Sequence, residues 1–472
     1  MPIHIYNSLS RKKEEFVPLA PPAVNMYTCG VTVYDDSHIG HARSLYIFDV
    51  IRRYFIFRGF QVRFVRNITD IDDKIINRAK ELNTGWQELI KKYIERYYED
   101  LASLGIAKAD VEPRATENIP EMVRYIQGLI DNGFAYESGG DVYFNVRKFT
   151  DYGKLSGQSI DQMETGVRID PGELKKDPLD FALWKRSKVG EPSWDSPWGK
   201  GRPGWHIECS VMSQKFLKTD TLDIHAGGRD LIFPHHENEI AQAQALTGKP
   251  FAKYWIHHGL LTINAQKMSK SLGNFVTIKD FMTKYNDPDL LKLFFLSAHY
   301  SHPIDYNEEK VREAGKQKDI FLDFFDNVKS WSLGLNKRPV AFSDKDKSRI
   351  DSICNKFVEA LDDDFNTPIA LACLFELTDL GQGFVSSDKV DAFTYVKSKL
   401  EEFFVVLGLS IPLPYEATEE VKNKIREMED ARKAKDFSKS DKIREELREV
   451  YDLAVGNTAS SITISRVRIE RK

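Results

Sequence analysis

The residues best suited to chemistry first appear in a short loop, CGVTVYDDSHIGHARS (residues 29–44), which holds Cys29, His38 and His41. Thiolates and imidazoles are ligands that zinc prefers, so the three residues could form part of a metal site. The HIGH motif (38–41) also suits a nucleoside triphosphate. Gly40 lets a ligand approach the backbone, and the start of a following helix favours negative charge. Imidazoles can donate hydrogen bonds to phosphate oxygens. An internally bonded histidine pair is the third alternative, and the loop alone does not decide between them.

A second basic motif, KMSKS, spans residues 267–271 and is followed by LGN. Lys267 and Lys270 flank a short serine-containing loop, which suits a mobile clamp that neutralises phosphates, because lysine acts there as a point charge. Taken alone, the motif could also be an ordinary exposed basic turn. HIGH and KMSKS in one chain favour the phosphate-binding interpretation of both.

A third group of polar residues lies in FPHHENEIAQAQAL (233–246) and GWHIECS (204–210). His235 and Glu239 are four apart and would share one face of a helix. Together with Cys29 and Cys209 they would provide two thiolates, one imidazole and one carboxylate, a suitable zinc set. The alternatives are a polar helix face and a buried thiol. Neither explains why a cysteine begins the HIGH loop in a chain with only four cysteines.

The elements that must position these residues follow from hydrophobic periodicity. Residues 24–34 and 60–66 read as buried strands, and residues 42–59 between them read as a helix that ends at Gly59. Strand, helix and strand in this space predict a parallel βαβ unit. Ligands of such sheets bind beyond the carboxyl ends of the strands, where the polar turns 35–41 and 67–73 fall.

The rest of the chain suggests an insertion and a helical end. Residues 74–104 look helical, and 110–200 have an irregular pattern rich in Trp, Pro and Gly. Strand-like segments return at LDIHAGG (222–228) and YWIHHGLLTI (254–263). Helical periodicity dominates after about 315, and a charged helical stretch, 419–450, precedes a β-like tail.

Composition narrows the class of protein. The 472 residues are 42% hydrophobic with a net charge of −4, which indicates a globular chain without a globally basic nucleic-acid surface. We expect no membrane span, because no apolar run reaches about 20 residues. The N-terminus has no signal-peptide pattern, so a cytoplasmic protein is expected. Four cysteines in so long a chain are no disulfide framework, and Cys354 and Cys373, in helical patterns, are expected in a core.

These motifs together resemble the cysteinyl-tRNA synthetases, a family of class I aminoacyl-tRNA synthetases. The resemblance covers nearly the whole chain through YTCGVTVYD, HIGH, NITDIDDKI, GWHIECS, FPHHENEIAQ and KMSKSLGN. It implies that Cys29, Cys209, His235 and Glu239 hold one zinc ion, with His236 as the alternative ligand. It assigns His38, Gly40, His41 and Lys270 to ATP, and His38, His41, Lys267 and Lys270 to catalysis.

The resemblance also implies a substrate pocket. Gly30, Thr32 and Thr69 would line the amino-acid site, Trp205 would pack over bound cysteine, and His225 would approach it. Asp230 would contact the amino group or the ribose. Family members often carry another residue at Arg229, so its role is open.

The implied fold is α/β, with a Rossmann-like parallel-sheet catalytic domain over residues 1–110 and 201–315. Residues 111–200 would be a connective-peptide insertion, 316–410 a helical bundle and 415–472 a small α+β anticodon-binding domain. The tail, VGNTASSITISRVRIERK, departs from the family because it lacks the expected tryptophan. The resemblance therefore implies no particular anticodon-contacting residue in this tail.

The implied function is a cysteine–tRNA ligase that uses ATP with Mg²⁺ to activate L-cysteine and charges tRNA(Cys), acting as a monomer. Zinc would recognise the substrate thiolate, which a hydroxyl-bearing serine cannot mimic. One alternative is a paralogue that transfers cysteine to a small amine, which would not need the RNA-binding end at 315–450. The other is a non-catalytic zinc and RNA-binding protein, which intact HIGH and KMSKS motifs disfavour.

Overall fold

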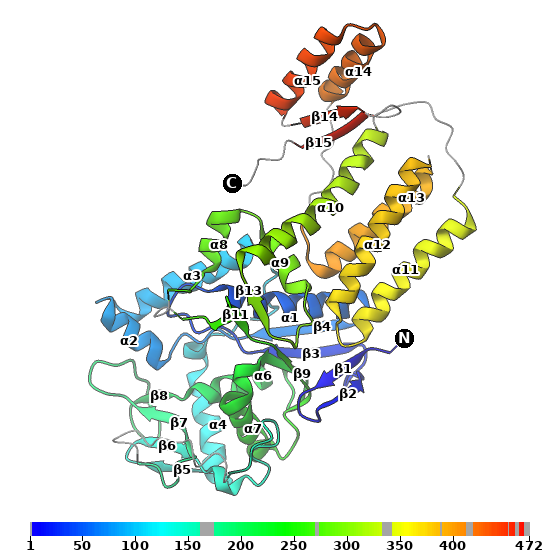
Figure 1. Ribbon diagram of the computed structural model, residues 1–472. Coiled ribbons are helices and arrows are strands. Elements are labelled where there is room, and N and C mark those ends of the chain that lie inside the picture. The colour runs from blue at the N-terminus through cyan, green and yellow to red at the C-terminus, as the bar shows by residue number, and fades with distance from the viewer. Residues whose placement is uncertain are drawn as a thin grey trace. The chain divides into compact units, whose positions relative to one another are not determined.

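The computed structural model describes residues 2–160, 174–269, 273–332, 342–387, 389–411, 419–451, 453–457 and 462–466. The chain divides into two compact units (Figure 1). Unit 1 comprises Met1–Pro288, Ala298–Asn307 and Asp362–Asn366. Unit 2 comprises Asp289–Ser297, Glu308–Leu361 and Thr367–Lys472.

The centre of unit 1 is a four-stranded parallel sheet with the order β10-β9-β3-β4. Its strands are β3 (Ala23–Thr28), β4 (Gln61–Arg66), β9 (Leu222–Gly228) and β10 (Ala252–His258). Helix α1 (Ile39–Phe57) connects β3 to β4, so the predicted parallel βαβ unit is confirmed. Strand β9 is buried along its whole length, as expected for a parallel sheet that is covered on both faces.

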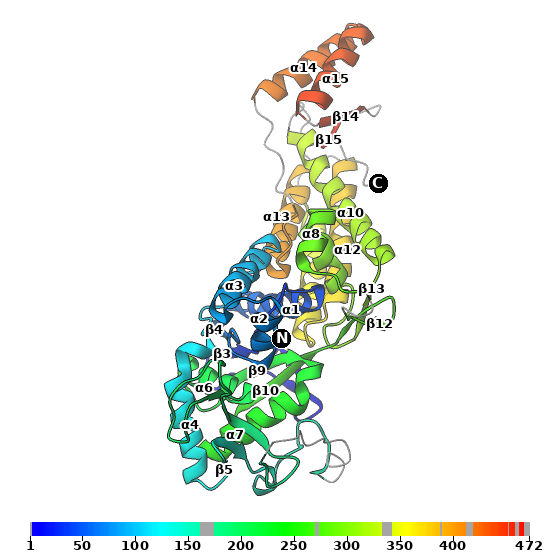
Figure 2. The ribbon, with the colours of Figure 1, turned by 90° about the vertical axis from the view of Figure 1, so that its left-hand side faces the viewer.

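Besides α1, the described residues of unit 1 form the helices α2 (Asp73–Glu81), α3 (Trp86–Ser103), α4 (Ile119–Asp131), α6 (Trp205–Leu217), α7 (Glu237–Thr247) and α8 (Ile278–Tyr285). Helices α4, α6 and α7 pack against one another (Figure 2). The stretch 74–104, expected to be helical, is two helices because residues 82–85 interrupt it. Helix α3 begins after Gly85 as its N-cap.

The segment from 110 to 200 is more regular than its sequence pattern indicates. It contains α4 and most of an antiparallel sheet with the order β5-β6-β7-β8. The strands are β5 (Ala135–Ser138), β6 (Asp141–Phe144), β7 (Phe181–Arg186) and β8 (Gly201–Pro203). Such short strands leave little alternation to detect, although Gly139 and Gly140, both with positive φ, form a typical hairpin turn.

Two smaller sheets complete unit 1. They consist of β1 (His4–Asn7) with β2 (Lys12–Glu15), and of β11 (Leu261–Ile263), β12 (Gln266–Lys267) and β13 (Ile304–Tyr306). The β1–β2 hairpin lies beside β10, since the Ser8 amide donates to the Trp255 carbonyl at 2.9 Å.

Unit 2 is mainly helical, as predicted for the second half of the chain. Its elements are α9 (Pro288–Leu296), α10 (Glu308–Ser332), α11 (Asp344–Asp362), α12 (Thr367–Ser386), α13 (Val390–Leu407), α14 (Glu419–Lys433), α15 (Phe437–Tyr451), β14 (Leu453–Asn457) and β15 (Ile462–Arg466). Cys354 and Cys373 are buried in these helices, as predicted. A β-like tail is present as an antiparallel pair.

We expected no membrane span, but one helix is long and apolar enough to be a candidate. Residues Thr367–Val385 of α12 are long enough to cross a membrane and have a mean hydropathy of 1.2. Half of that window is buried within the protein. A core helix of a helical domain meets the same criterion, so this feature is weak evidence for a membrane span.

Candidate metal centre and active site

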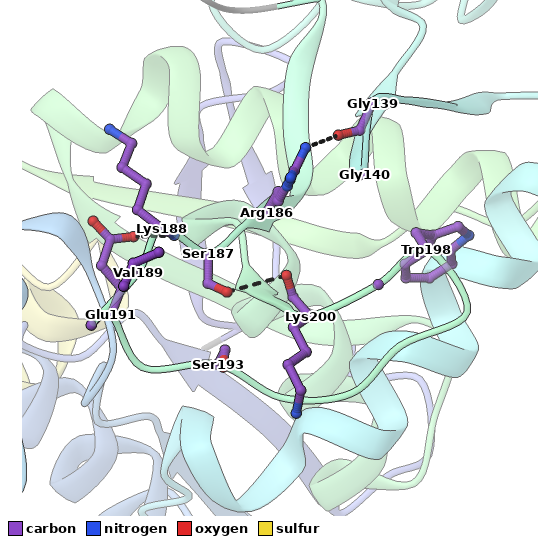
Figure 3. Close-up of a pocket in the computed structure, with 12 residues that line it drawn as sticks. Gly139, Gly140, Arg186, Ser187, Lys188, Val189, Glu191, Ser193, Trp198 and Lys200 are labelled. Carbon is purple, nitrogen blue, oxygen red and sulfur yellow. Dashed lines mark hydrogen bonds between the residues drawn. The ribbon is translucent and has the colours of Figure 1, made fainter.

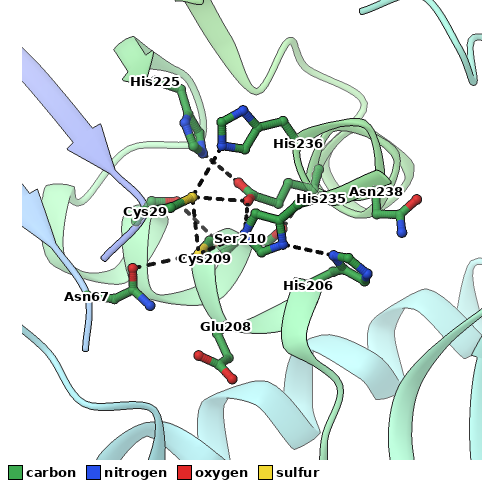
Figure 4. Close-up of polar contacts among 12 residues, drawn as sticks. Cys29, Asn67, His206, Glu208, Cys209, Ser210, His225, His235, His236 and Asn238 are labelled. Atoms are coloured by element: carbon green, nitrogen blue, oxygen red, sulfur yellow. Dashed lines mark hydrogen bonds and ion pairs between the residues drawn. The ribbon is translucent and has the colours of Figure 1, made fainter. Parts of the chain in front are cut away.

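Four side chains that are far apart in the sequence converge at the carboxyl edge of the parallel sheet (Figure 4). Cys29 follows β3, Cys209 lies in α6, His235 precedes α7 and Glu239 lies in its first turn. The two sulfur atoms are 3.7 Å apart, and the Cys209 sulfur is 3.6 Å from His235 Nε2. Glu239 Oε1 lies 2.8 Å from His235 Nε2 and 3.5 Å from the Cys29 sulfur. The predicted ligand residues therefore share one site.

The donor set fits a tetrahedral zinc ion. Zn–S bonds of about 2.3 Å and Zn–N bonds of about 2.0–2.1 Å would place two sulfurs about 3.8 Å apart and sulfur and nitrogen about 3.6 Å apart. The observed separations of 3.7 Å and 3.6 Å match these values. Cys209, His235 and Glu239 are buried and Cys29 is half-buried, so the site is shielded from solvent.

The electrostatics of the two thiols also favour a cation. Burial opposes ionisation of Cys209, but the hydrogen bond from Cys29 and the facing His235 lower the pKa of the Cys209 thiol to about 6. Burial, Cys209 and Glu239 raise the pKa of the Cys29 thiol well above its usual range. The protein alone therefore stabilises one thiolate here more easily than two. A divalent cation would stabilise the second.

A second set of potential ligands shares two members with the first. Cys29 and Glu239 also lie close to His225 and His236. His236 Nε2 is 3.3 Å from the Cys29 sulfur, and its Nδ1 is 2.8 Å from His257 Nε2. This set has only one cysteine, and thiolates are ligands that zinc prefers. The set with two cysteines is therefore the better zinc site, and the assignment of ligands stays a prediction.

Aromatic rings wall the cluster. Trp205, the first residue of α6, stacks on His235 with ring centroids 4.0 Å apart and is 38% exposed. His225 stacks on Trp255 at 4.5 Å, and its Nε2 lies 2.5 Å from Glu239 Oε2. Both predicted pocket residues thus contact predicted ligands. That Trp205 packs over a bound cysteine stays a prediction.

A buried polar chain supports the cluster from the β4 side. Asn67 Oδ1 accepts from the Gly30 amide at 2.8 Å, and its Nδ2 donates to Thr69 Oγ1 at 3.1 Å. The Thr69 hydroxyl donates to Glu208 Oε2 at 2.8 Å. A Cβ at Gly30 would lie 1.5 Å from the Asn67 carbonyl oxygen, so only glycine permits this approach. Thr32 pairs with Thr69 as an isolated bridge.

The HIGH motif forms the N-terminus of α1. The His38 ring accepts from the Gly40 and His41 amides at 3.1 and 3.3 Å and stacks on His41 with centroids 3.7 Å apart. Burial and the charges of His38 and Lys74 lower the pKa of His41 well below its usual range. His41 is therefore neutral at pH 7 and can donate a hydrogen bond to a phosphate oxygen.

The KMSKS segment lies against the HIGH motif. A Cβ at Gly40 would be 3.7 Å from the Met268 methyl, and the Ile39 amide donates to the Val276 carbonyl at 3.1 Å. Asn274 closes the loop by accepting from the Ser269 amide at 2.8 Å and donating to the Lys267 carbonyl at 3.2 Å. Lys267 is exposed at the end of β12. Lys270 lies outside the described residues.

Asp230 lies apart from the metal ligands. It is exposed just after β9, and a Cβ at Gly228 would lie 2.3 Å from its Oδ1 and 3.4 Å from His258 Nε2. Its carboxylate therefore borders the carboxyl ends of β9 and β10, where a substrate of this sheet would bind.

Several residues of the site were not predicted. They are Asn67, His206, Glu208, His257, His258 and Asn274. The buried pair His257 and His258 ends β10 at the same sheet edge, and burial lowers their pKa values to about 3 and about 4. A histidine pair at the carboxyl end of a predicted strand was a usable signal. The hydrogen bonds that link Asn67, Thr69 and Glu208 join separate segments, and no sequence pattern predicted them.

A separate pocket lies in the insertion (Figure 3). It has a volume of about 700 Å³ and is lined mainly by residues 186–200, between β7 and β8. The Ser187 hydroxyl donates to the Lys200 carbonyl at 3.2 Å and the Arg186 side chain to the Gly139 carbonyl at 3.4 Å. None of the predicted site residues lines it.

Comparison with known proteins identifies the chain's relatives. A family model described as tRNA synthetases class I (C) catalytic domain matches residues 15–316, and a DALR domain model matches residues 356–411. The chain is 51% identical over 451 residues to the cysteine–tRNA ligase of Geobacillus thermodenitrificans, covering 94% of this chain and 95% of the relative. It is 50% identical to the cysteine–tRNA ligase of Aquifex aeolicus, covering 87% and 84%.

Solved structures show the same fold at low sequence identity. Methionyl-tRNA synthetase of Mycobacterium tuberculosis, in complex with methionyl-adenylate, superposes with a TM-score of 0.58 at 15% identity, covering 84% of this chain and 93% of that one. A catalytic-domain match over most of the chain and half-identical relatives of nearly equal length lead to one conclusion. The chain belongs to the cysteine–tRNA ligase family of class I aminoacyl-tRNA synthetases.

Proposed function

We propose that this chain activates L-cysteine with ATP and transfers it to the 3′ end of tRNA(Cys). The observation that carries the proposal is the convergence of Cys29, Cys209, His235 and Glu239 beside the HIGH loop of a class I fold. Two cysteines at the centre of an amino-acid site suit a substrate that itself has a thiol.

The proposed zinc site selects cysteine over serine. When bound, zinc supplies a Lewis-acid centre that accepts a thiolate far better than a hydroxyl. Cys29, Cys209, His235 and Glu239 would hold it, and Glu239 would be the ligand held least firmly. Trp205 covers the amino-acid pocket, while Gly30 and Thr69 form its wall. A specific polar contact of this kind can favour the correct substrate over a close analogue by roughly 10⁴-fold in kcat/KM.

Activation needs positioning and charge stabilisation. The cysteine carboxylate oxygen attacks the α-phosphorus, the bond to the β-phosphate oxygen breaks, and pyrophosphate leaves. His38, Gly40 and His41 at the start of α1, with Lys267 and Lys270, stabilise the developing negative charge. Mg²⁺ accompanies the ATP phosphates. Asp230 holds the amino group or the ribose.

Transfer follows without a covalent enzyme intermediate. A terminal ribose hydroxyl of the RNA attacks the activated carbonyl, and AMP leaves with the electron pair of the broken carbonyl–oxygen bond. The helices of unit 2 and residues 415–472 provide the surface for the rest of tRNA(Cys). The proposed setting is the cytoplasm, with the protein acting as a monomer.

Two half-reactions test this function. We expect pyrophosphate exchange into ATP that depends on cysteine, and charging of tRNA(Cys) with labelled cysteine. Exchange without charging would favour a small-amine acceptor. If the protein shows neither activity, the remaining candidate is a non-catalytic zinc and RNA-binding protein, and the proposal is overturned.

A further inference from the structure

A pocket of about 550 Å³ lies beside the candidate active site in unit 1. We call it the Arg11–Arg229 pocket, and its walls include Tyr6, Ser8, Arg11, Ser156, Arg229 and Phe233. Its size is within the range of about 300–1,000 Å³ typical of ligand sites. Asp230 also lines it, and the wall formed by residues 229–233 leads directly into His235. The pocket is therefore lined by the predicted substrate residue Asp230, and the chain that forms this wall continues into the candidate ligand His235.

The two guanidinium groups of this pocket have no acidic partner. Among the described residues, neither Arg11 nor Arg229 forms an ion pair or a side-chain hydrogen bond. In the pocket of residues 186–200, by contrast, Lys200 pairs with Asp195 at 3.0 Å. Arg11 and Arg229 face one carboxylate, Asp230, in the lining of their pocket, so its charged groups sum to a positive charge. A positive lining favours an anion, and arginine matches phosphate oxygens with paired donors.

The wall of this pocket is held in place by buried contacts. Glu237, fully buried in α7, accepts from the Gly153 and Ser156 amides at 2.9 and 2.8 Å. Gly157 follows with φ +72°, and a Cβ there would lie 1.7 Å from an Arg11 guanidinium nitrogen. Gly157 therefore gives the Arg11 side chain the space it occupies. Glu237 stands between His235 and Glu239, so the same segment positions this wall and the candidate ligands.

The Arg11–Arg229 pocket combines the two arginines with aromatic rings and hydroxyl groups. Tyr6 and Phe233 are half-buried, and Ser8 and Ser156 add hydroxyl groups. Arginines beside aromatic side chains are the combination that binds unpaired nucleotides, by phosphate contact and base stacking. An ATP phosphate shares the anionic chemistry, but its proposed place is at HIGH and KMSKS, and none of the described residues of these motifs lines this pocket.

We propose that the Arg11–Arg229 pocket binds an unpaired nucleotide of the RNA acceptor strand, next to the terminal nucleotide that receives cysteine. The inference rests on the proposed function. It gives Arg229 a role in holding a phosphodiester, with Arg11 as its partner. The pocket would thereby set the position of the reactive ribose.

Arg229→Met and Arg11→Met test the proposal, because methionine removes the charge and keeps an unbranched side chain. Arg124→Met is the control, since Arg124 is an exposed arginine of α4 that lines neither pocket and pairs with Glu121 at 3.3 Å. Each variant is measured for cysteine-dependent pyrophosphate exchange and for binding of tRNA(Cys). Binding is compared for intact tRNA and for tRNA that lacks its unpaired 3′-terminal nucleotides.

Each pocket variant should weaken binding of intact tRNA about tenfold and leave binding of the shortened tRNA unchanged. Exchange should stay at the native level, and the control should match the native protein in every assay. An equal loss of binding affinity for the intact and the shortened tRNA would indicate non-specific electrostatic attraction to RNA and would overturn the proposal. A parallel fall in exchange would assign the pocket to ATP and also overturn it. If the native protein itself fails to charge tRNA, the proposed function fails instead, and this distinguishes the two failures.

Discussion

At the scale of single residues, the HIGH loop separates two chemistries within one short stretch. Cys29 faces Cys209 and Glu239, whereas His38 caps α1 and stacks on His41. Gly40 leaves room for the His38 ring, because a Cβ at this position would lie 2.9 Å from two of its ring atoms. The cap geometry of His38 therefore depends on a glycine at 40.

Gly40→Ala should impair activation without affecting the metal site. The added methyl group would displace the His38 ring, and a misplacement of this kind can cost about 10²-fold in rate. We expect cysteine-dependent pyrophosphate exchange to fall by this order while zinc content stays native. Gly383→Ala in α12 is the matched control, since a Cβ there meets nothing within 4 Å. Native exchange in the Gly40 variant would refute this role.

At the scale of elements, the βαβ unit was predictable, and the insertion was not. The unit has two strands of six residues, β3 and β4, around the 19-residue helix α1, and elements of this length produce clear periodicity. Strand β8 has three residues, Gly201–Pro203, and no period can be read from it. Cys29, Cys209, His235 and Glu239 could be singled out as candidate ligands because their residue types are chemically distinctive, and their role as ligands stays a prediction. Asn67 and Glu208 could not be singled out, since Gly30 and Thr69, their partners, come from other segments of the chain.

Helix α3 contains a buried carboxyl group that should make stability depend on pH. Burial raises the pKa of Asp100 to about 7, helped by the charge of Asp36 and opposed by Arg96. Because the folded pKa exceeds the ordinary value of 3.8, the stability that this group contributes is fully present below about pH 4 and is lost as the pH rises through about 7.

Asp100→Asn should remove this dependence. At pH 8 we expect the free energy of unfolding of the variant to exceed that of the native protein by more than about 1 kcal/mol, because the native carboxyl must be buried as an anion. At pH 5 the difference should be smaller. Urea unfolding of both proteins at the two pH values measures it, and a difference that does not change with pH would contradict the assignment.

At the scale of the whole molecule, the catalytic unit and the helical unit are distinct bodies, matched by two separate family models. The candidate metal centre, the HIGH loop and the Arg11–Arg229 pocket all belong to unit 1. The described residues of the candidate site all come from one chain, and the monomer stays a proposal. We expect light scattering to give the mass of a single chain at micromolar concentration, and the mass of a dimer would contradict it.

The central claim is that a zinc ion on Cys29, Cys209, His235 and Glu239 recognises the thiol of the substrate. The most direct measurement counts zinc and compares activation of cysteine and serine in the native protein, Cys209→Ser and the control Cys354→Ser. The native protein and the control should hold one zinc per chain and prefer cysteine by about 10⁴-fold, and Cys209→Ser should lose both. Full zinc content and undiminished selectivity in Cys209→Ser would contradict the claim.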